Sequence, residues 1–392
     1  MIGLIDFVFH NPAKIIFGRN ALSHLGEEAA QYGNKALLVY GGGSVKRIGL
    51  YDQVLDALRE SDIAVWELSG IVPNPRLARV REGVDLCRRE GIGLVLALGG
   101  GSVIDTAKGI VNGVPDDGDV WDFYIGKRIP KKSLPLGTIL TLPAAGSEMS
   151  YSSVITNEDG MLKRGYNSIT NVPTFSILNP EWSYTLPPYQ TACGCVDIMA
   201  HMMERYFTRV EHVELTDRLI AAGMKTVLNN AHRVLETPDD YDARAEIMWT
   251  GTLAHNTFLQ TGRIGDWGSH KVEHELSAEY DIAHGAGLSI VFPAWMKYAL
   301  RQAPAKLAQF ATDVFDVPTC FGSETEIALE GISRLEAFYR SIGMPTSLKE
   351  AGISGTDYAA LAARALPTEE STIGEYITLH RKDIVEIYRL AE

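Results

Sequence analysis

Short apolar runs alternate with amphipathic stretches along the first half of the chain. Residues 50–60 and 77–90 carry apolar side chains at helical spacing, with polar residues between them. Strand–helix–strand units of this length predict a parallel sheet covered by helices. The strand-like runs between the helical stretches are residues 35–40, 63–68, 93–98 and 136–142.

The second half of the chain has a different period. From Pro187 onward, apolar residues recur at helical spacing and strand signals fade. Residues 327–342 and 383–390 follow this helical pattern as well. The most regular apolar stripe consists of Leu215, Leu219, Ile220, Val227, Leu228, Ala231 and Leu235.

The change of period predicts two domains. It falls at Thr185-Leu186-Pro187-Pro188, where two prolines suit the first turn of a helix and end whatever precedes it. We therefore expect a Rossmann-like α/β domain over residues 1–186 and an all-helical domain over residues 187–392. The length of 392 residues agrees with two domains of ordinary size.

Composition and charge exclude several classes of protein. The hydrophobic fraction of 46% is ordinary for a globular core, and the formal net charge of −13 argues against nucleic acid or an anionic membrane as a partner. No apolar run approaches the ~20 residues that span a bilayer, and the N-terminus lacks the basic start of a signal peptide. Four cysteines in a chain of this length do not form a disulfide framework. We expect a cytoplasmic protein.

Two glycine triplets follow predicted strands. Gly41–Gly43 precede Ser44, and Gly99–Gly101 precede Ser102 at the start of a helical pattern. Ligands of open α/β sheets bind at the carboxyl ends of the strands, and a helix N-terminus there attracts phosphate. Neither triplet completes GxGxxG, and glycines also end strands for turn reasons alone. Two triplets at equivalent ends, each followed by serine, nevertheless favour a diphosphate site.

The first triplet bears on the choice of cofactor. Sites specific for NAD usually place Asp or Glu at this strand end to hold the ribose 2′-hydroxyl. Here positions 41–44 carry no acid, and Lys46 and Arg47 follow them. The pattern favours NADP(H), although Lys46 and Arg47 can also be an ordinary solvated basic pair.

A carboxylate and four histidines in the helical half have metal-ligand spacing. Asp197 and His201 stand four residues apart, so both side chains share one helix face. His270, His274 and His284 follow within fifteen residues of one another, without the HExxH of a zincin. A set of one carboxylate and several imidazoles suits one divalent ion, Fe(II) or Zn(II). The alternative for Asp197 and His201 is a hydrogen-bonded pair in the core.

Together these motifs resemble the iron-dependent (group III) alcohol dehydrogenase family, in its NADPH-dependent butanol dehydrogenase and aldehyde reductase branch. The resemblance rests on GGGSxxDxAK at residues 99–108, DxxxH at residues 197–201, and His270 and His284 with His274 between them. It implies a dinucleotide-binding α/β domain, a helical domain on the plan of dehydroquinate synthase, and a metal in the cleft between them. It also implies a homodimer, in which the apolar residues 2–16 could pair across subunits.

The resemblance assigns a role to each matching residue. Asp197, His201, His270 and His284 match the metal ligands of the family. The cofactor contacts comprise the diphosphate loop Gly99, Gly100, Gly101 and Ser102, then Gly42 and Ser44 near the 2′-phosphate, Asn74, the second loop with Thr141, Leu142 and Ser147, and Lys163 at the nicotinamide ribose.

The implied chemistry is hydride transfer between NADP(H) and a primary alcohol or aldehyde, such as butanol or butanal. Asp197 and His270 would act catalytically through the metal, which polarises the carbonyl. His274, one helical turn beyond His270, would relay the alcohol proton or only orient a ligand. Two alternatives stay open: a metal-dependent lyase of the dehydroquinate synthase type that uses NAD transiently, and a cofactor-binding protein without activity. Cys193 and Cys195 receive no role.

Overall fold

The computed structural model describes residues 3–392, which divide into two compact units. We call the first the α/β unit; it contains His10–Leu186 and Pro238–Asn256. The second, the helical unit, contains residues 3–9, Pro187–Thr237 and Thr257–Glu392. The predicted combination of an α/β N-terminal half with a helical C-terminal half is confirmed. These units do not correspond to a single division of the chain at Pro187. Residues 3–9 group with the helical unit, and Pro238–Asn256 group with the α/β unit.

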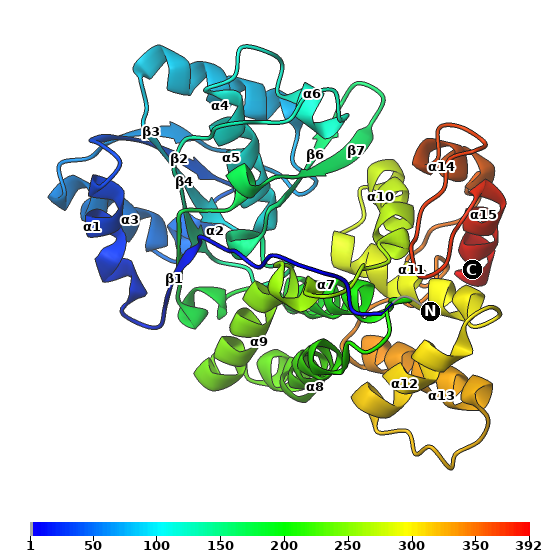
Figure 1. The fold of residues 1–392 in the computed structure, drawn as a ribbon. Coiled ribbons are helices and arrows are strands. Elements are labelled where there is room, and N and C mark those ends of the chain that lie inside the picture. Colours follow the sequence, from blue (N-terminus) through cyan, green and yellow to red (C-terminus); the bar gives the residue numbers. More distant parts are fainter. Residues whose placement is uncertain (1–2) are drawn as a thin grey trace. The chain divides into compact units, whose positions relative to one another are not determined.

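A six-stranded parallel sheet forms the centre of the α/β unit (Figure 1). Its order is β1-β8-β5-β4-β2-β3, so the chain moves outward from β2 to β3 and then returns to the other side of β2 as β4. This is the flavodoxin-like order of a doubly wound sheet, extended by β1, and its topological switch point lies between β2 and β4. The strands are β1 (Lys14–Phe17), β2 (Lys35–Tyr40), β3 (Ala64–Leu68), β4 (Leu94–Gly99), β5 (Leu136–Leu140) and β8 (Phe175–Leu178).

Helices cover both faces of this sheet because successive strand residues point to opposite sides. Leu37 and Val39 of β2 face a core shared with α4 (Leu77–Glu90) and α5 (Gly101–Gly113). Leu38 and Tyr40 face a second core shared with α1 (Leu25–Ala30) and α3 (Leu50–Glu60). This double burial explains why β2 and β4 read as continuous apolar runs.

Smaller elements complete the α/β unit. An antiparallel hairpin, β6 (Ser152–Asn157) and β7 (Leu162–Asn167), stands apart from the main sheet. α9 (Tyr241–Ala254) comes from the second half of the chain, and its Met248 belongs to the core cluster that also contains residues of α4 and α5. The remaining short elements are η1 (Ala21–His24), α2 (Ser44–Arg47), α6 (Trp121–Tyr124), η2 (Ser147–Met149), η3 (Ile169–Asn171) and η4 (Pro180–Ser183).

The helical unit is built around α7 (Pro188–Tyr206). Every residue of this helix from Thr191 to Tyr206 is buried, so α7 is covered on all sides over that length. Pro188 at its first turn and Pro187 before it end the preceding segment as the sequence predicts. The other elements are α8 (Glu214–Glu236), η5 (Phe258–Gln260), α10 (Gly268–Tyr280), α11 (His284–Ala299), α12 (Pro304–Phe315), α13 (Glu324–Ser341), α14 (Tyr358–Ala365) and α15 (Arg381–Leu390).

Across residues 3–392, none of the helices combines the length and the apolar character needed to cross a membrane. All four cysteines are free: Cys87, Cys193 and Cys195 are buried, and Cys320 is exposed.

Candidate functional site

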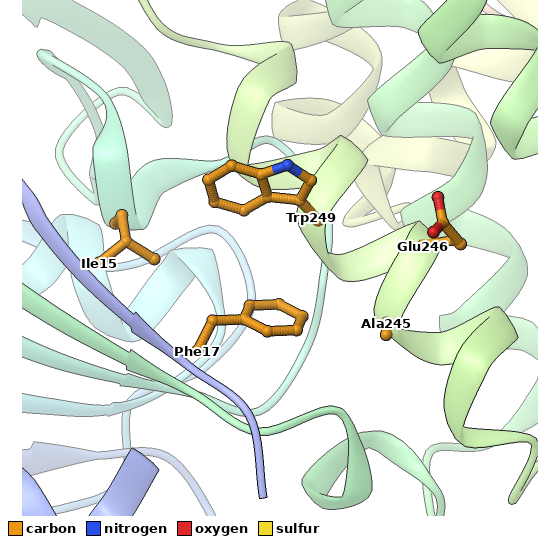
Figure 2. Close-up of a pocket in the computed structure, with 5 residues that line it drawn as sticks. All are labelled: Ile15, Phe17, Ala245, Glu246 and Trp249. Carbon is orange, nitrogen blue, oxygen red and sulfur yellow. The ribbon is translucent and has the colours of Figure 1, made fainter.

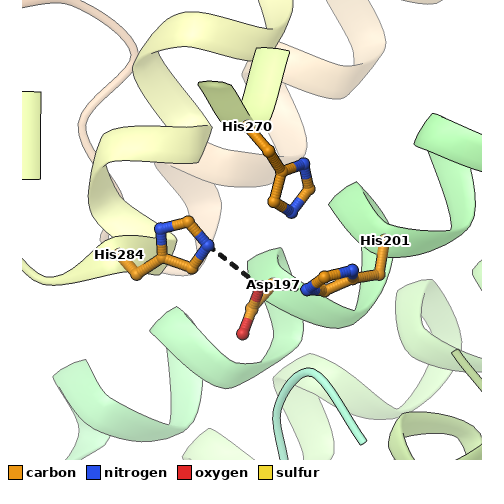
Figure 3. Close-up of side chains that lie close together, drawn as sticks. All are labelled: Asp197, His201, His270 and His284. Atoms are coloured by element: carbon orange, nitrogen blue, oxygen red, sulfur yellow. Dashed lines mark ion pairs between the residues drawn. The ribbon is translucent and has the colours of Figure 1, made fainter. Parts of the chain in front are cut away.

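Asp197, His201, His270 and His284 converge on one point of the helical unit (Figure 3). One potential ligand atom from each lies within 4.8 Å of all the others. His201 Nε2 is 3.3 Å and His284 Nε2 is 3.8 Å from Asp197 Oδ1, and the His201 and His270 ring centroids are 4.4 Å apart. Asp197 and His201 come from one face of α7, His270 from the first turn of α10, and His284 is the first residue of α11.

The polar atoms at this point fit a metal ion. His270 Nε2 and Asp197 Oδ1 are buried, and neither has a hydrogen-bond partner among residues 3–392. Burial, together with His270 and Arg205, lowers the pKa of His201 well below its usual value, so the imidazole is neutral, as a ligand must be. Buried polar atoms left unsatisfied are costly. A divalent cation that accepts one oxygen and three nitrogens would satisfy them.

Two buried glutamates lie behind the histidines. Glu204 Oε1 is 2.7 Å from His270 Nδ1, and a carboxylate oxygen of Glu273 bonds His284 Nδ1. Sequence reasoning did not identify either residue. The available signal is a repeated H-x-x-E: His201 precedes Glu204, and His270 precedes Glu273, each by three residues.

His274 lies beside this cluster and outside its four convergent groups. Its ring centroid is 5.6 Å from that of His284, and its side chain is half-buried. With Glu273 and His284 it forms a second group of potential ligands. The structure therefore brings His274 close to the predicted metal point.

Both glycine triplets lie at the carboxyl edge of the sheet, on the two strands that flank the switch point. Gly41–Gly43 follow β2, and Gly99 ends β4, whose Leu98 pairs in register with Tyr40. A Cβ at Gly42 or Gly101 would meet no atom of residues 3–392 within 4 Å, so both α-carbons are open to an approaching ligand. Helix α5 begins at Gly101, directly after Gly100, so a helix N-terminus adjoins this loop, the arrangement that favours phosphate binding.

The other predicted cofactor residues lie on connected segments of the α/β unit. The Thr141 N–H donates to the Gly99 carbonyl (3.1 Å), and a Cβ at Gly100 would stand 3.1 Å from Leu142 Cβ, so the second loop adjoins the first. The Thr156 N–H donates to the Pro75 carbonyl (2.8 Å). Since Thr156 pairs in register with Lys163, this bond ties the loop that carries Asn74 to the hairpin that carries Lys163.

Side chains of helix α5 form hydrogen bonds with the second cofactor loop and with the segment that follows it. The Ser147 hydroxyl donates to Asp105 Oδ1 (2.7 Å), and the Val154 N–H donates to Asp105 Oδ2 (3.0 Å). Lys108 Nζ, fully buried one turn later, donates to the carbonyls of Ser150 (3.0 Å) and Ser152 (2.7 Å). Ser147, predicted as a cofactor contact, thus has its hydroxyl bonded to Asp105.

The basic residues after the first triplet have different surroundings. Lys46 Nζ lies over the ring of Tyr51, 4.2 Å from its centroid, and 5.1 Å from that of Tyr40. The hydroxyls of both tyrosines donate to Glu67 on β3, at 2.6 Å from Tyr40 and 2.8 Å from Tyr51. A guanidinium nitrogen of Arg47, in contrast, would be 3.2 Å from a Cβ at Gly43, so it lies against the loop itself.

A cavity of about 360 Å³ lies elsewhere on the α/β unit (Figure 2). Side chains of β1 and α9 line it, and Phe17 and Trp249 meet there edge to face at 6.1 Å. No predicted site residue takes part in this cavity, which is lined by Ile15, Phe17, Ala245, Glu246 and Trp249.

Comparison with known proteins shows the family of this chain. Two family models match the chain: "Iron-containing alcohol dehydrogenase" over residues 12–180 and "Fe-containing alcohol dehydrogenase family, C-terminal" over residues 191–391. The probable NADH-dependent butanol dehydrogenase 1 of Bacillus subtilis is 43% identical over 98% of this chain and 99% of its own length. The NADPH-dependent aldehyde reductase YqhD of Escherichia coli is 36% identical over 94% and 95%.

Solved structures match equally well. The crystal structure of NADH-dependent butanol dehydrogenase A from Thermotoga maritima superposes with a TM-score of 0.95 at 41% identity, covering 100% of both chains. Family models thus match both halves of the sequence, and a solved structure matches the whole chain. The chain belongs to the iron-containing alcohol dehydrogenase family.

Proposed function

We propose that this protein is a metal-dependent dehydrogenase that interconverts short primary alcohols and aldehydes, of butanol and butanal size, with NADP(H). Alcohol dehydrogenase or aldehyde reductase activity is the activity of its relatives. The observation that carries the metal dependence is the convergence of Asp197, His201, His270 and His284, with buried polar atoms aimed at one point.

These four residues would hold the metal, and their oxygen and nitrogen donors suit Fe(II) or Zn(II). When bound, a divalent ion supplies a Lewis acid for the carbonyl oxygen, and the nicotinamide supplies or accepts the hydride. Asp197 contributes the one negative charge among the four ligands, while the three histidines bind as neutral imidazoles.

His274 would move the proton in this reaction. Its half-buried imidazole lies 5.6 Å from the ring of His284, centroid to centroid. In this role it would exchange a proton with the substrate oxygen, directly or through a water molecule. Positioning of His284 is the alternative role for this residue.

NADP(H) is the cofactor that local charge favours. Arg47 lies against Gly43, and no acid occurs at positions 41–44. Lys46 adds less positive charge to the loop, because its ammonium group lies over the rings of Tyr40 and Tyr51, whose hydroxyls bond Glu67. Relatives of both kinds exist: the Bacillus subtilis and Thermotoga maritima proteins are named as NADH-dependent, and the Escherichia coli protein as NADPH-dependent. NADH is therefore the second candidate.

A homodimer and a cytoplasmic location stay predictions from the sequence. Ile2, the start of the segment expected to pair across subunits, lies outside the described residues. Within the same segment, Leu4, Phe7 and Val8 are exposed in the single chain, as a subunit contact would require. Light scattering on the purified protein tests the assembly.

The experiment for the proposed function combines elemental analysis with kinetics. Purified protein should contain about one iron or zinc per chain and should oxidise NADPH with butanal faster than it oxidises NADH. His270→Ala should lose metal and activity together. Full turnover after verified removal of the metal would contradict the metal's role, and a clear preference for NADH would contradict the choice of cofactor. Inactivity of the metal-loaded protein with every alcohol and aldehyde of a broad panel would favour a lyase or a non-enzyme.

A further inference from the structure

Glu204 and Glu273 contact two of the metal-ligating imidazoles on the side away from the metal point. We propose that they are positioning residues, which fix the tautomer and orientation of His270 and His284 and so set the affinity of the site for a divalent cation. The inference rests on the proposed metal dependence.

Glu204 joins α7 to the start of α10. Its side chain is fully buried, and its Oε1 accepts hydrogen bonds from His270 Nδ1 (2.7 Å) and from the His270 backbone N–H (3.0 Å). Its Oε2 accepts from the Trp267 N–H. One carboxylate therefore holds both the ring of His270 and the backbone that carries it. The positive end of the α10 dipole further favours this anion.

Glu273 performs the same role between α10 and α11. Its side chain is also fully buried; Oε2 bonds His284 Nδ1, and Oε1 accepts a hydrogen bond from the Ser277 hydroxyl. A Cβ at Gly287 would stand 2.3 Å from Glu273 Oε1. The glycine at position 287 therefore leaves the space that this carboxylate occupies, which accounts for the second glycine of the His284-Gly285-Ala286-Gly287 motif.

The chemical effect follows from the imidazole ring. A carboxylate that accepts from Nδ1 keeps the proton there, which leaves the Nε2 lone pair for a metal. The same hydrogen bond makes the ring more basic and stops it from rotating. Each of these two histidines is held by a glutamate from the ligand-bearing helix that precedes it in the chain: α7 holds α10, and α10 holds α11.

The charges also point to a cation. Asp197, Glu204 and Glu273 place three buried carboxylates at or directly behind the convergence point. Buried anions are costly without compensation, and a divalent ion bound by the three imidazoles and Asp197 supplies opposite charge.

Helix α10 offers a matched control. Glu275 is buried on the same helix, with a side chain 3% exposed, but it pairs with Arg364 at 3.4 Å. Glu204→Gln, Glu273→Gln and Glu275→Gln each replace a buried carboxylate by an amide of the same shape. Circular dichroism and thermal unfolding confirm that each variant is folded.

Each protein is stripped with a chelator and titrated with Zn²⁺ against a chromophoric competitor; Co²⁺ absorption spectra report the ligand geometry. We expect Glu204→Gln and Glu273→Gln to bind Zn²⁺ about 10–100-fold more weakly and to shift the Co²⁺ bands, while Glu275→Gln binds as the wild type does.

If Glu204→Gln does not fold, the Zn²⁺ affinity of Glu273→Gln alone tests the inference. Wild-type affinity in the folded Glu204 and Glu273 variants, or an equal loss in Glu275→Gln, would overturn the inference and leave the proposed function intact. A wild-type protein that binds no metal would overturn both.

Discussion

Gly285 packs directly on the backbone of Cys193. A Cβ at position 285 would stand 2.2 Å from the Cys193 carbonyl oxygen and 2.7 Å from its Cα. The first turn of α11 therefore meets α7 with no side chain between the two backbones. Because His284 begins α11 and Asp197 lies one turn beyond Cys193 on α7, this contact sets how closely the two ligands approach. Cys193 thus matters through its backbone, while its thiol lies 3.7 Å from the Met344 sulfur.

Gly285→Ala should weaken metal binding at least tenfold. The added methyl group would force α11 away from α7 and move His284 Nε2 from Asp197, and misplacement of one ligand weakens a metal site severely. Zinc titration of the stripped protein measures the loss. Gly322→Ala is the control, because the three atoms nearest to its added carbon belong to the Glu326 side chain and not to the backbone of another helix. Wild-type affinity in Gly285→Ala would show that the helix contact does not set the site.

His274→Gln should lower kcat about a hundredfold while the metal content stays at the wild-type level. Loss of a general acid or base typically costs 10²–10⁴-fold, and the four convergent ligands do not include His274. Steady-state kinetics with butanal and metal analysis of the same sample decide the matter. If the variant loses metal in parallel with activity, His274 instead holds a ligand in place.

Arg47→Ala should raise the Kd for NADPH about 10–100-fold and leave the Kd for NADH nearly unchanged. A guanidinium that pairs with the 2′-phosphate contributes roughly 1.5–3 kcal/mol, and about 1.4 kcal/mol corresponds to a factor of ten. Lys46→Ala is the control at the neighbouring position, and it should raise the Kd for NADPH less, since Lys46 lies over the rings of Tyr40 and Tyr51. Quenching of protein fluorescence gives both constants. A larger effect at Lys46 would reverse the assignment.

Lys108 should make stability rise with pH in alkaline solution. Burial lowers the pKa of Lys108 to about 8, against 10.5 for an exposed lysine. Between these values the unfolded chain binds a proton that the folded chain does not, so the free energy of unfolding increases with pH. The cost of burying the charge is fully present below pH 8 and disappears as pH approaches 10.5.

Comparison with Lys108→Met isolates this contribution. At about 1.4 kcal/mol for each unit of pKa shift, the wild type should gain at most roughly 3 kcal/mol relative to the variant between pH 8 and 10.5. Urea unfolding at several pH values measures the difference. Curves that stay parallel would mean that Lys108 does not titrate in this range.

Strong periodicity made part of the fold predictable. β2 and β4 are buried on both faces, so their positions were visible as apolar runs, and the glycine triplets marked their carboxyl ends. β1 and β8 were not identified, because four residues each are too short to show a period. The grouping of α9 with the sheet depends on contacts of Met248, Thr252 and Trp249 that no local pattern encodes.

Part of the candidate site could likewise be predicted from the sequence, and part could not. Asp197 and His201 were visible because helical spacing places them on one face. The spacing also indicated His270, His274 and His284, and the family resemblance selected His270 and His284 among these three. Glu204 and Glu273 were missed, since a glutamate inside a helix ordinarily faces water and the role of each depends on a histidine of a different helix. Likewise, the contact between Arg47 and Gly43 arises from a four-residue helix that the spacing did not predict.

The division of the chain into units limits how this protein can be dissected. The polypeptide passes from one unit to the other after Phe9, Leu186, Thr237 and Asn256. A fragment ending at Leu186 would lack α9, and the buried Glu148 would lose the Thr252 hydroxyl that bonds it at 2.6 Å. A fragment starting at Pro187 would carry α9 without the sheet on which it packs. Cutting the gene once cannot yield two self-sufficient halves, so the cofactor loops and the ligand cluster have to be studied in the intact polypeptide.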